Sequence, residues 1–496
     1  MYKIRQIKYT TNTTSIQVYK IVNRKRVILR HIGTARSDQE KTDLLLLAQD
    51  YIEKISKQLC LFNEEQSGSI INLNQIEFIG VYYSFLYELL SKLIVKIGFD
   101  KLQSNMLLDL VIIRMITPAS KLESIELLNE YFGIKHRRQN YYDFAPQWLE
   151  LKSKAEYVAL KYAQKHYAFT YDLLFYDVTT LYFETFKEDD LRRNGFSKDN
   201  KSQQPQVLVA LMVTKEGFPI AYEVFAGNTF EGHTIIPVIK SFIIKNKVKE
   251  FTIVADAAMI SNENIKNLKE NHINYIVGAR LGNLPSDILS EIDKTIPREN
   301  GKNIRIKTDN GYLICSFSAI RYRKDKYEME KQIQKAKEII ENPSKSKKLK
   351  FTKSNGQKIE LNEKLIDKTQ KMLGIKGYYT NLEENIVNNN TIIERYHELY
   401  KIEHAFRITK SDLQTRPIFH FKEEPIKLHL LISFIALVIS KHIELRTNLS
   451  IKKFINECRK VKDARIINHV TGKEIKMRAK PSDIIIELIS KLDLLT

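Results

Sequence analysis

The chain has 496 residues, too many for a single hydrophobic core, and its 43% hydrophobic content is ordinary for a folded globular protein. Lys and Arg outnumber Asp and Glu by 79 to 59, a net charge of +20 that favours a polyanionic partner such as nucleic acid. The alternative is the compositional drift of an AT-rich genome. Three widely spaced cysteines offer neither a disulfide framework nor a zinc site and fit a reducing cytoplasm.

The first part of the chain is predicted to change from strands to helices. Residues 1–74 form an N-terminal β/α unit, because "SIQVYKIV" and "KRVILRHIG" have the pattern of paired strands and helical spacing follows over about 39–62. Residues 75–168 are predicted to be a helix-rich block that can hold a DNA-binding module, because helical spacing recurs through "FIGVYYSFLYELLSKLIVKIGF" and "NMLLDLVIIRMITPASKLESIELLNEYFGI". No motif in it identifies a recognition helix.

An α/β core is predicted over 169–279 and 386–440. A strand over 172–178 precedes a hairpin that turns at 215–217, then a helix from His233, a strand ending in Asp256, a helix capped by Ser261, and a further strand. This order predicts a mixed sheet with helices on its faces. The apolar run "LHLLISFIALVIS" at 428–440 is too short to span a bilayer and is predicted to be a buried helix.

The core is interrupted by a predicted insertion domain over 280–385. It contains a β-hairpin turning at Asn310–Gly311, a charged helix over about 324–342 and a Lys-rich loop. Residues 321–370 hold 15 Lys and Arg against 8 Asp and Glu, which favours phosphate contacts that are insensitive to sequence. Residues 441–496 are predicted to be a basic, helical C-terminal region.

Three carboxylates are candidates for one site. Asp177 follows the apolar run "LLFY", and Asp256 ends "FTIVAD", so two strands of one sheet deliver an acid to the same place. A buried-strand carboxylate is costly unless it is solvated, hydrogen-bonded or bound to a cation, and Mg²⁺ prefers such oxygens. Taken singly, each Asp is more often an ordinary strand-end residue.

The third acid, Glu403, is placed on a predicted helix over 391–412. Tyr396, Glu403 and Lys410 are spaced by seven, so they fall nearly one above another, with Tyr400 and Arg407 on the adjoining flank. The ordinary alternative is a solvated helix face with an i,i+4 pair between Glu403 and Arg407.

The segments "FYDVTTLYFET", "VLVALMVTKEGFPIAYEVFAGNTFEGHT", "IVADAAMIS" and "YHELYKIEHAFRITKSDLQTRPIFH" resemble, in order, the DDE transposases of bacterial insertion sequences. The resemblance is to the insertion-sequence-4 superfamily and its 1634-type branch. It implies an RNase H-like catalytic core with a β-containing insertion. It also implies that Asp177, Asp256 and Glu403 are catalytic and bind two Mg²⁺ ions, for which Mn²⁺ substitutes.

The superfamily pattern Y-x2-R-x3-E-x6-K is matched by Tyr396, Glu403 and Lys410, whereas Leu399 stands where the Arg belongs. The family roles of Tyr396 and Lys410 are phosphate contacts. Arg407, one turn beyond Glu403, is a candidate replacement for the missing Arg. With Tyr400, these residues form the predicted DNA-binding set.

The resemblance implies metal-dependent cleavage at transposon ends followed by 3′-OH strand transfer into target DNA. The implied partners are double-stranded DNA, both inverted-repeat ends and target, and a second copy of the chain in a synaptic homodimer. We expect a bacterial cytoplasmic, nucleoid-associated protein without a membrane partner. Two alternatives stay open: an RNase H-like nuclease without strand transfer, and a catalytically inactive, transposase-derived DNA-binding protein.

Overall fold

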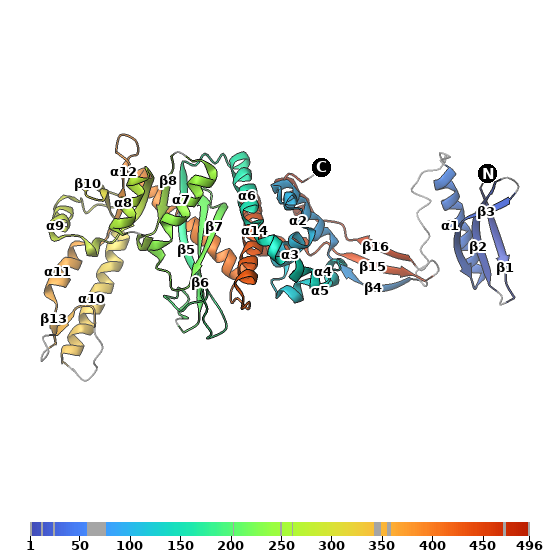
Figure 1. The fold of residues 1–496 in the computed structure, drawn as a ribbon, viewed down its shortest axis with the longest axis horizontal. Helices are drawn as coiled ribbons and strands as arrows, with labels where there is room; N and C mark the ends of the chain where they lie inside the picture. The colour runs from blue at the N-terminus through green and yellow to red at the C-terminus, as the bar shows by residue number, and fades with distance from the viewer. Residues whose placement is uncertain are drawn as a thin grey trace.

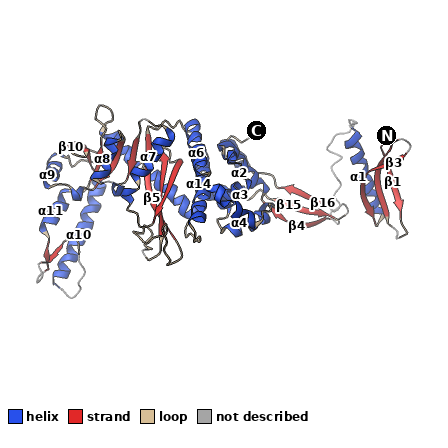
Figure 2. Cartoon of the chain, viewed as in Figure 1, coloured by secondary structure: helices blue, strands red, loops and turns tan. Residues whose placement is uncertain are grey.

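The computed structural model describes residues 2–10, 13–22, 25–56, 76–201, 203–248, 250–259, 261–341, 349–354, 359–469 and 473–494. Figure 1 shows a mixed α/β architecture in which a large sheet is followed by a helical module and a protruding three-stranded sheet. The prediction of a mixed sheet with helices on its faces is therefore confirmed. Figure 2 shows how strands and helices alternate through the central part.

The N-terminal unit is a three-stranded antiparallel sheet with one helix. Strands β1 (Tyr2–Lys8), β2 (Thr14–Val22) and β3 (Lys25–Ala35) pair in chain order, and α1 (Asp38–Ser56) contacts all three. Ile16 and Val18 of β2 pack against Leu44 and Ala48 of α1 in a small core of their own. Residues 57–62, the predicted end of this helix, lie outside the described residues.

The segment that begins the predicted helical block is a strand. β4 (Ile76–Tyr82) pairs with β15 (Asp463–Asn468), and β15 pairs with β16 (Lys473–Arg478). The helical prediction for residue 75 onward is therefore wrong at its start, and the all-helical prediction for 441–496 is wrong over this hairpin. The cause is pairing between segments nearly 400 residues apart, which local spacing cannot reveal.

A helical module surrounds α14 (Glu423–Thr447), which contacts most of its helices. Its other members are α2 (Ser84–Ile97), α3 (Asn105–Ile116), α4 (Lys121–Phe132), α5 (Arg138–Leu149), α6 (Lys152–His166), α15 (Ile451–Cys458) and α16 (Asp483–Lys491). By length and composition α14 is apolar enough to cross a membrane, but 94% of its apolar window is buried within the fold. This agrees with the predicted buried helix at 428–440.

The largest sheet of the described residues has eight strands in the order β10-β11-β14-β9-β8-β5-β6-β7. Its core strands are β5 (Leu173–Tyr182), β6 (Gln206–Thr214), β7 (Pro219–Ala226), β8 (Thr252–Ala255) and β9 (Asn274–Ala279). β5, β8 and β9 are parallel, whereas β5-β6-β7 is an antiparallel meander. The turn between β6 and β7 falls at the predicted Gly217, whose φ of +80° is readily adopted by glycine.

The predicted insertion contributes strands to this same sheet. β10 (Asn303–Thr308) and β11 (Gly311–Phe317) form the expected hairpin, and β14 (Ile375–Thr380) joins β11 to β9. The remaining elements of the insertion are α9 (Ser286–Thr295), α10 (Ala319–Glu341), β12 (Thr352–Ser354), β13 (Ile359–Leu361) and α11 (Glu363–Lys371). Figure 1 shows α10 and α11 extending away from the sheet.

The helices α7 (Ile235–Asn246), α8 (Asn262–Glu270), α12 (Asn389–His397) and α13 (Tyr400–Arg407) pack around the core strands. α8 begins as predicted, since the Ser261 hydroxyl accepts a hydrogen bond from the Asn264 N–H at 3.0 Å. α12 contacts β8, β9 and β14, and α13 contacts β5 and β6. These two helices therefore bring their side chains to the centre of the sheet.

Candidate active site

Asp177 lies on β5, and Asp256 directly follows the last residue of β8, the parallel strand beside it. In the β5–β8 ladder Tyr176 pairs with Ala255, so the next positions along both strands are Asp177 and Asp256. Adjacent strands lie about 4.8 Å apart, and side chains at matched positions point to the same face. The expectation that the first strand ends at 178 is wrong, because β5 continues to Tyr182 and Asp177 lies mid-strand. The strand that ends here is β8, at Ala255.

Asp177 occupies a largely buried position, with 14% of its side chain exposed. The pKa of Asp177 is raised to about 6, chiefly by burial, and the charges of Asp256 and Glu231 act in the same direction. Lys198 and a 2.7 Å hydrogen bond from the Val178 N–H act in the opposite direction. The carboxyl group therefore lies in an environment that favours a nearby cation.

Lys198 supplies the nearest positive charge, and sequence reasoning missed it. Its Nζ lies 3.8 Å from Asp177 Oδ1 and 3.0 Å from Glu231 Oε1, and it donates a 2.5 Å hydrogen bond to the Val178 carbonyl. The Glu231 oxygen is at ion-pair distance but has no partner with hydrogen-bonding geometry among the described residues. No sequence signal marked Lys198, since it belongs to a polar loop.

Glu231 is held in place by a buried hydrogen-bond network. It begins a 3₁₀ turn, Glu231–His233, whose Glu231 carbonyl accepts from the Thr234 hydroxyl at 2.6 Å. Thr234 in turn accepts from the Tyr176 hydroxyl at 2.7 Å, and the Asn264 amide donates to the Gly232 carbonyl at 2.6 Å. Glu231 is thus fixed beside the site. In the sequence only its position in "FEGHT", before a predicted helix, marked it.

Tyr396 reaches the second aspartate. Its hydroxyl donates to Asp256 Oδ1 at 3.1 Å, and burial with this negative neighbour raises the pKa of Tyr396 above its usual value. The approach depends on Gly278 of β9, because a Cβ there would lie 2.5 Å from the Tyr396 hydroxyl. Lys376 of β14 covers the Tyr396 ring, with Nζ 4.7 Å from the ring centroid.

The predicted continuous helix over 391–412 is interrupted. α12 ends at His397, α13 starts at Tyr400, and a π-helical turn over Ile408–Asp412 follows. Tyr396, Glu403 and Lys410 consequently do not form one straight row. At the junction the Lys401 ammonium donates to the Lys215 carbonyl at 2.7 Å, so the break packs against the β6–β7 turn.

Glu403 is exposed in the first turn of α13, and its charge acts on the same lysine, Lys376, as the charge of Asp256. Both acids raise the pKa of Lys376, although burial and Arg321 lower it overall. Leu399, at the position where the family pattern has Arg, is buried in the core.

The other predicted DNA-binding residues have different settings. Tyr400 is 61% exposed and Arg407 is exposed, so both are free to meet a ligand. Lys410 is instead buried against Asp199, at 3.2 Å, and Arg416 reaches the same carboxylate at 3.5 Å. Burial lowers the pKa of Lys410, and Asp199 opposes that shift.

The side chains around Asp177 have oxygen ligands of the kind that metal ions bind. Within the described ranges, no group of three or more His, Cys, Asp or Glu residues lies close enough to hold one. The oxygen chemistry nevertheless suits a hard cation, because Asp177 and Glu231 already converge on an ammonium and Asp256 is adjacent. A divalent ion held by these oxygens would take the place that the Lys198 ammonium now occupies.

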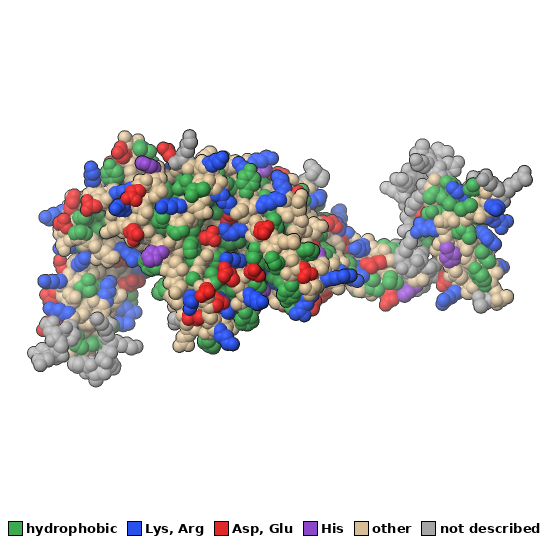
Figure 3. All heavy atoms as spheres, viewed as in Figure 1, with side chains coloured by type: hydrophobic (Ala, Val, Ile, Leu, Met, Phe, Trp, Pro, Cys, Tyr) green, Lys and Arg blue, Asp and Glu red, His purple; other side chains and the backbone are tan. Residues whose placement is uncertain are grey.

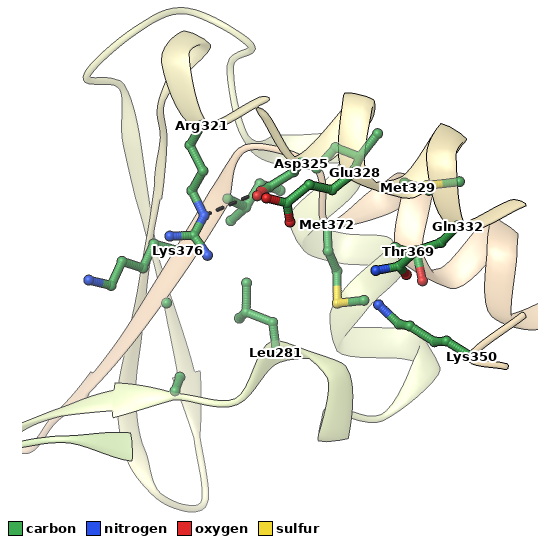
Figure 4. A pocket seen from close by; sticks show the side chains of 14 residues that line it. Leu281, Arg321, Asp325, Glu328, Met329, Gln332, Lys350, Thr369, Met372 and Lys376 are labelled. Carbon is green, nitrogen blue, oxygen red and sulfur yellow. Dashed lines mark ion pairs between the residues drawn. The ribbon is translucent and has the colours of Figure 1, made fainter. Parts of the chain in front are cut away.

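A pocket of about 280 Å³ lies between α10 and the start of β14. Figure 4 shows Arg321 and Lys376 at one side of it, with Arg321 Nε 3.3 Å from Asp325 Oδ2. Lys350 also lines it. Lys376 therefore connects the site to the insertion, because it lines this pocket and also covers the Tyr396 ring.

Comparison with known proteins gives the family. A solved structure of the piggyBac transposase synaptic complex with hairpin DNA is similar at 12% sequence identity and a TM-score of 0.37, covering 76% of this chain and 69% of that chain. No curated protein matches. The family model described as "Transposase DDE domain" matches residues 168–439, which is 272 of the 496 residues and includes all three candidate acids. The chain therefore belongs to the DDE transposase family.

Proposed function

We propose that this protein is a DNA transposase that cleaves the ends of its mobile element and joins the freed 3′-OH to target DNA. The observation that carries the proposal is the adjacency of Asp177 and Asp256 on parallel strands, within the segment that matches the family. We also propose that the core is RNase H-like. The order β7-β6-β5-β8-β9, an antiparallel meander followed by two parallel strands, supports this.

In the proposed reaction Asp177, Asp256 and Glu403 hold divalent cations, Mg²⁺ with Mn²⁺ as a substitute. When bound by these three residues, divalent ions would supply activation of the attacking oxygen and stabilisation of charge on the leaving oxygen. Tyr396 orients Asp256 through its hydroxyl hydrogen bond. Glu403 reaches the pair by a small movement of α13, which the breaks at both ends of that helix favour.

The DNA backbone is proposed to cross the face that carries Tyr396, Tyr400, Arg407 and Lys410. Tyr400 and Arg407 are exposed and contact phosphates directly. Lys410 contacts a phosphate once Asp199 releases it. The bound DNA is an inverted-repeat end held by a synaptic homodimer in the bacterial nucleoid.

The test is cleavage of plasmid DNA carrying both flanks of the protein's own gene, with Mg²⁺ or Mn²⁺. Asp177→Asn, Asp256→Asn and Glu403→Gln should each abolish cleavage while retaining DNA binding in a mobility-shift assay. Matched controls are Asp309→Asn at the β10–β11 turn and Glu394→Gln on α12, both exposed. A variant that still nicks at the normal rate removes its residue from the site.

A second assay separates the alternatives. Pre-nicked gene-flank duplexes with a free 3′-OH are incubated with a target plasmid. Joined products are expected from a transposase. Cleavage without joining favours a nuclease, and binding without either reaction favours an inactive DNA-binding descendant.

A further inference from the structure

The N-terminal unit has a segregated charge pattern. Residues 1–37, which form its sheet, contain no Asp or Glu but nine basic residues: Lys3, Arg5, Lys8, Lys20, Arg24, Lys25, Arg26, Arg30 and Arg36. Over residues 1–56 the acids are confined to the α1 segment, at Asp38, Glu40, Asp43, Asp50 and Glu53. A sheet of uniform positive charge carries a field that attracts polyanions.

The two faces of this sheet differ. One face packs its apolar residues, including Ile16 and Val18, against α1. Because alternate strand residues point to opposite faces, Gln17 and Tyr19 point away from the helix. The 2.8 Å hydrogen bond between Ser15 Oγ and His31 Nε2 places His31 on that same outer face.

The outer face presents hydrogen-bonding side chains in a row across the strands. Arg5 pairs with Gln17, and Gln17 pairs with His31, so one residue from each strand stands in line. Gln17 Oε1 is buried and has no hydrogen-bond partner among the described residues. Beside this row the Arg26 guanidinium lies 5.6 Å from the Tyr19 ring centroid. In Figure 3, basic side chains are visible on this unit.

We propose that this outer face binds double-stranded DNA in the major groove. Three strands about 4.8 Å apart fit a groove about 12 Å wide, which admits β-ribbons. Arg5, Gln17 and His31 face the base edges, and the surrounding Lys and Arg contact phosphates. The choice of DNA as the polyanion rests on the proposed function. The binding face itself rests on the charge and register of the sheet.

The test uses the full chain and matched arginine variants. Arg5→Gln and Arg26→Gln each remove a positive charge from the outer face. Arg30→Gln is the control, because it removes a positive charge from the same strand as Arg26 but from the face that packs against α1. There the Arg30 guanidinium lies 4.9 Å from the Tyr51 ring centroid. Binding is measured by fluorescence anisotropy over a series of salt concentrations. The probes are a gene-flank duplex, a random-sequence duplex and anionic phosphatidylserine vesicles.

The outer-face variants should bind both duplexes roughly ten-fold more weakly, and the log–log salt slope should fall by about 1 for each lost contact. Arg30→Gln should leave both quantities near wild type. Gln17→Ala should reduce the preference for the gene flank about five-fold or more without changing the slope, because it contacts bases rather than phosphates. Unchanged duplex binding in all outer-face variants overturns the proposal, provided that circular dichroism shows the unit folded.

Vesicle binding in place of duplex binding also overturns it. The exposed apolar residues Ile21, Val22, Val27 and Ile28 near the β2–β3 end make that outcome a real competitor. The proposed function fails separately, when wild-type protein does not cleave its gene flanks or when Asp177→Asn still does. If Arg5→Gln binds the duplexes as wild type does while Asp177→Asn loses cleavage, only the proposal for the N-terminal face is refuted.

Discussion

Substituting Gly278 by Ala should disturb Asp256 through Tyr396. The added Cβ would lie 2.5 Å from the Tyr396 hydroxyl, closer than real Cβ contacts, so the ring must shift by a large part of an ångström. The hydroxyl now donates to Asp256 Oδ1 at 3.1 Å, and a shift of that size breaks the bond. The remaining near contacts, Ala257 Cβ at 3.1 Å and its N at 3.2 Å, are tight but tolerable with small adjustment.

The expected magnitude follows from the bond that is lost. A hydrogen bond to a charged group contributes about 1.5–3 kcal/mol, and each 1.4 kcal/mol is a factor of ten in rate. Gly278→Ala and Tyr396→Phe should therefore each slow cleavage about 10- to 100-fold. Because the two changes remove the same bond, the double variant should be no slower than Tyr396→Phe alone.

The assay is single-turnover cleavage of the gene-flank duplex by the two single variants and the double variant. Gly282→Ala is the matched control, since a Cβ at Gly282 has nothing within 4 Å. Tyr396→Phe removes the clashing oxygen, so Gly278→Ala should be nearly neutral in that background. An equal loss of rate in both backgrounds refutes the reasoning, because the added methyl group then acts through the strand and not through the hydroxyl.

Replacing Lys198 by Met removes the ammonium between two carboxylates, so Mn²⁺ should raise the melting temperature more than in wild type, whereas Lys201→Met on the same loop should behave as wild type. His442 is buried with a pKa lowered to about 3, so it stays neutral in the fold while the unfolded chain binds a proton below about pH 6.5. Stability near α14 should then fall by about 1.4 kcal/mol per pH unit as pH drops from 6.5 towards 3, measured by hydrogen exchange, and His442→Gln should flatten that slope. Arg478 bonds both oxygens of Asp463, whose side chain is 3% exposed, at 2.7 and 3.0 Å, so Arg478→Met should destabilise the β4-β15-β16 sheet by about 2 kcal/mol, visible as faster exchange of its amides.

Local sequence patterns predicted the elements that local interactions determine. The turns at Gly217 and Gly311 have positive φ in the structure, and Ser261 caps its helix. The alternating and continuous apolar patterns of the core segments predicted the strands of a mixed sheet. The neighbouring positions of Asp177 and Asp256 followed from two strands that each carry an acid after an apolar run.

Elements that depend on distant partners were missed. β4 is stabilised by a hairpin nearly 400 residues later, and the insertion's strands extend the main sheet through β14. The sequence has no Pro or Gly at the break before α13. It coincides with packing of Lys401 against the β6–β7 turn, and this contact exists only in the folded chain.

The same reasoning explains why the cation beside Asp177 was invisible in the sequence. Lys198 reaches the acids because two adjacent contacts hold its part of the loop. Its own N–H donates to the Thr180 hydroxyl at 3.2 Å, and the carboxylate of the next residue, Asp199, forms ion pairs with Lys410 and Arg416. Lys198 and Asp199 therefore connect the candidate acids to Lys410, the lysine that the family pattern assigns to a DNA phosphate contact. A phosphate that draws Lys410 away from Asp199 also removes one anchor of Lys198. If Lys410 binds a phosphate as proposed, we expect DNA binding to ease the access of a metal ion to Asp177 through the adjacent side chains of Lys198 and Asp199.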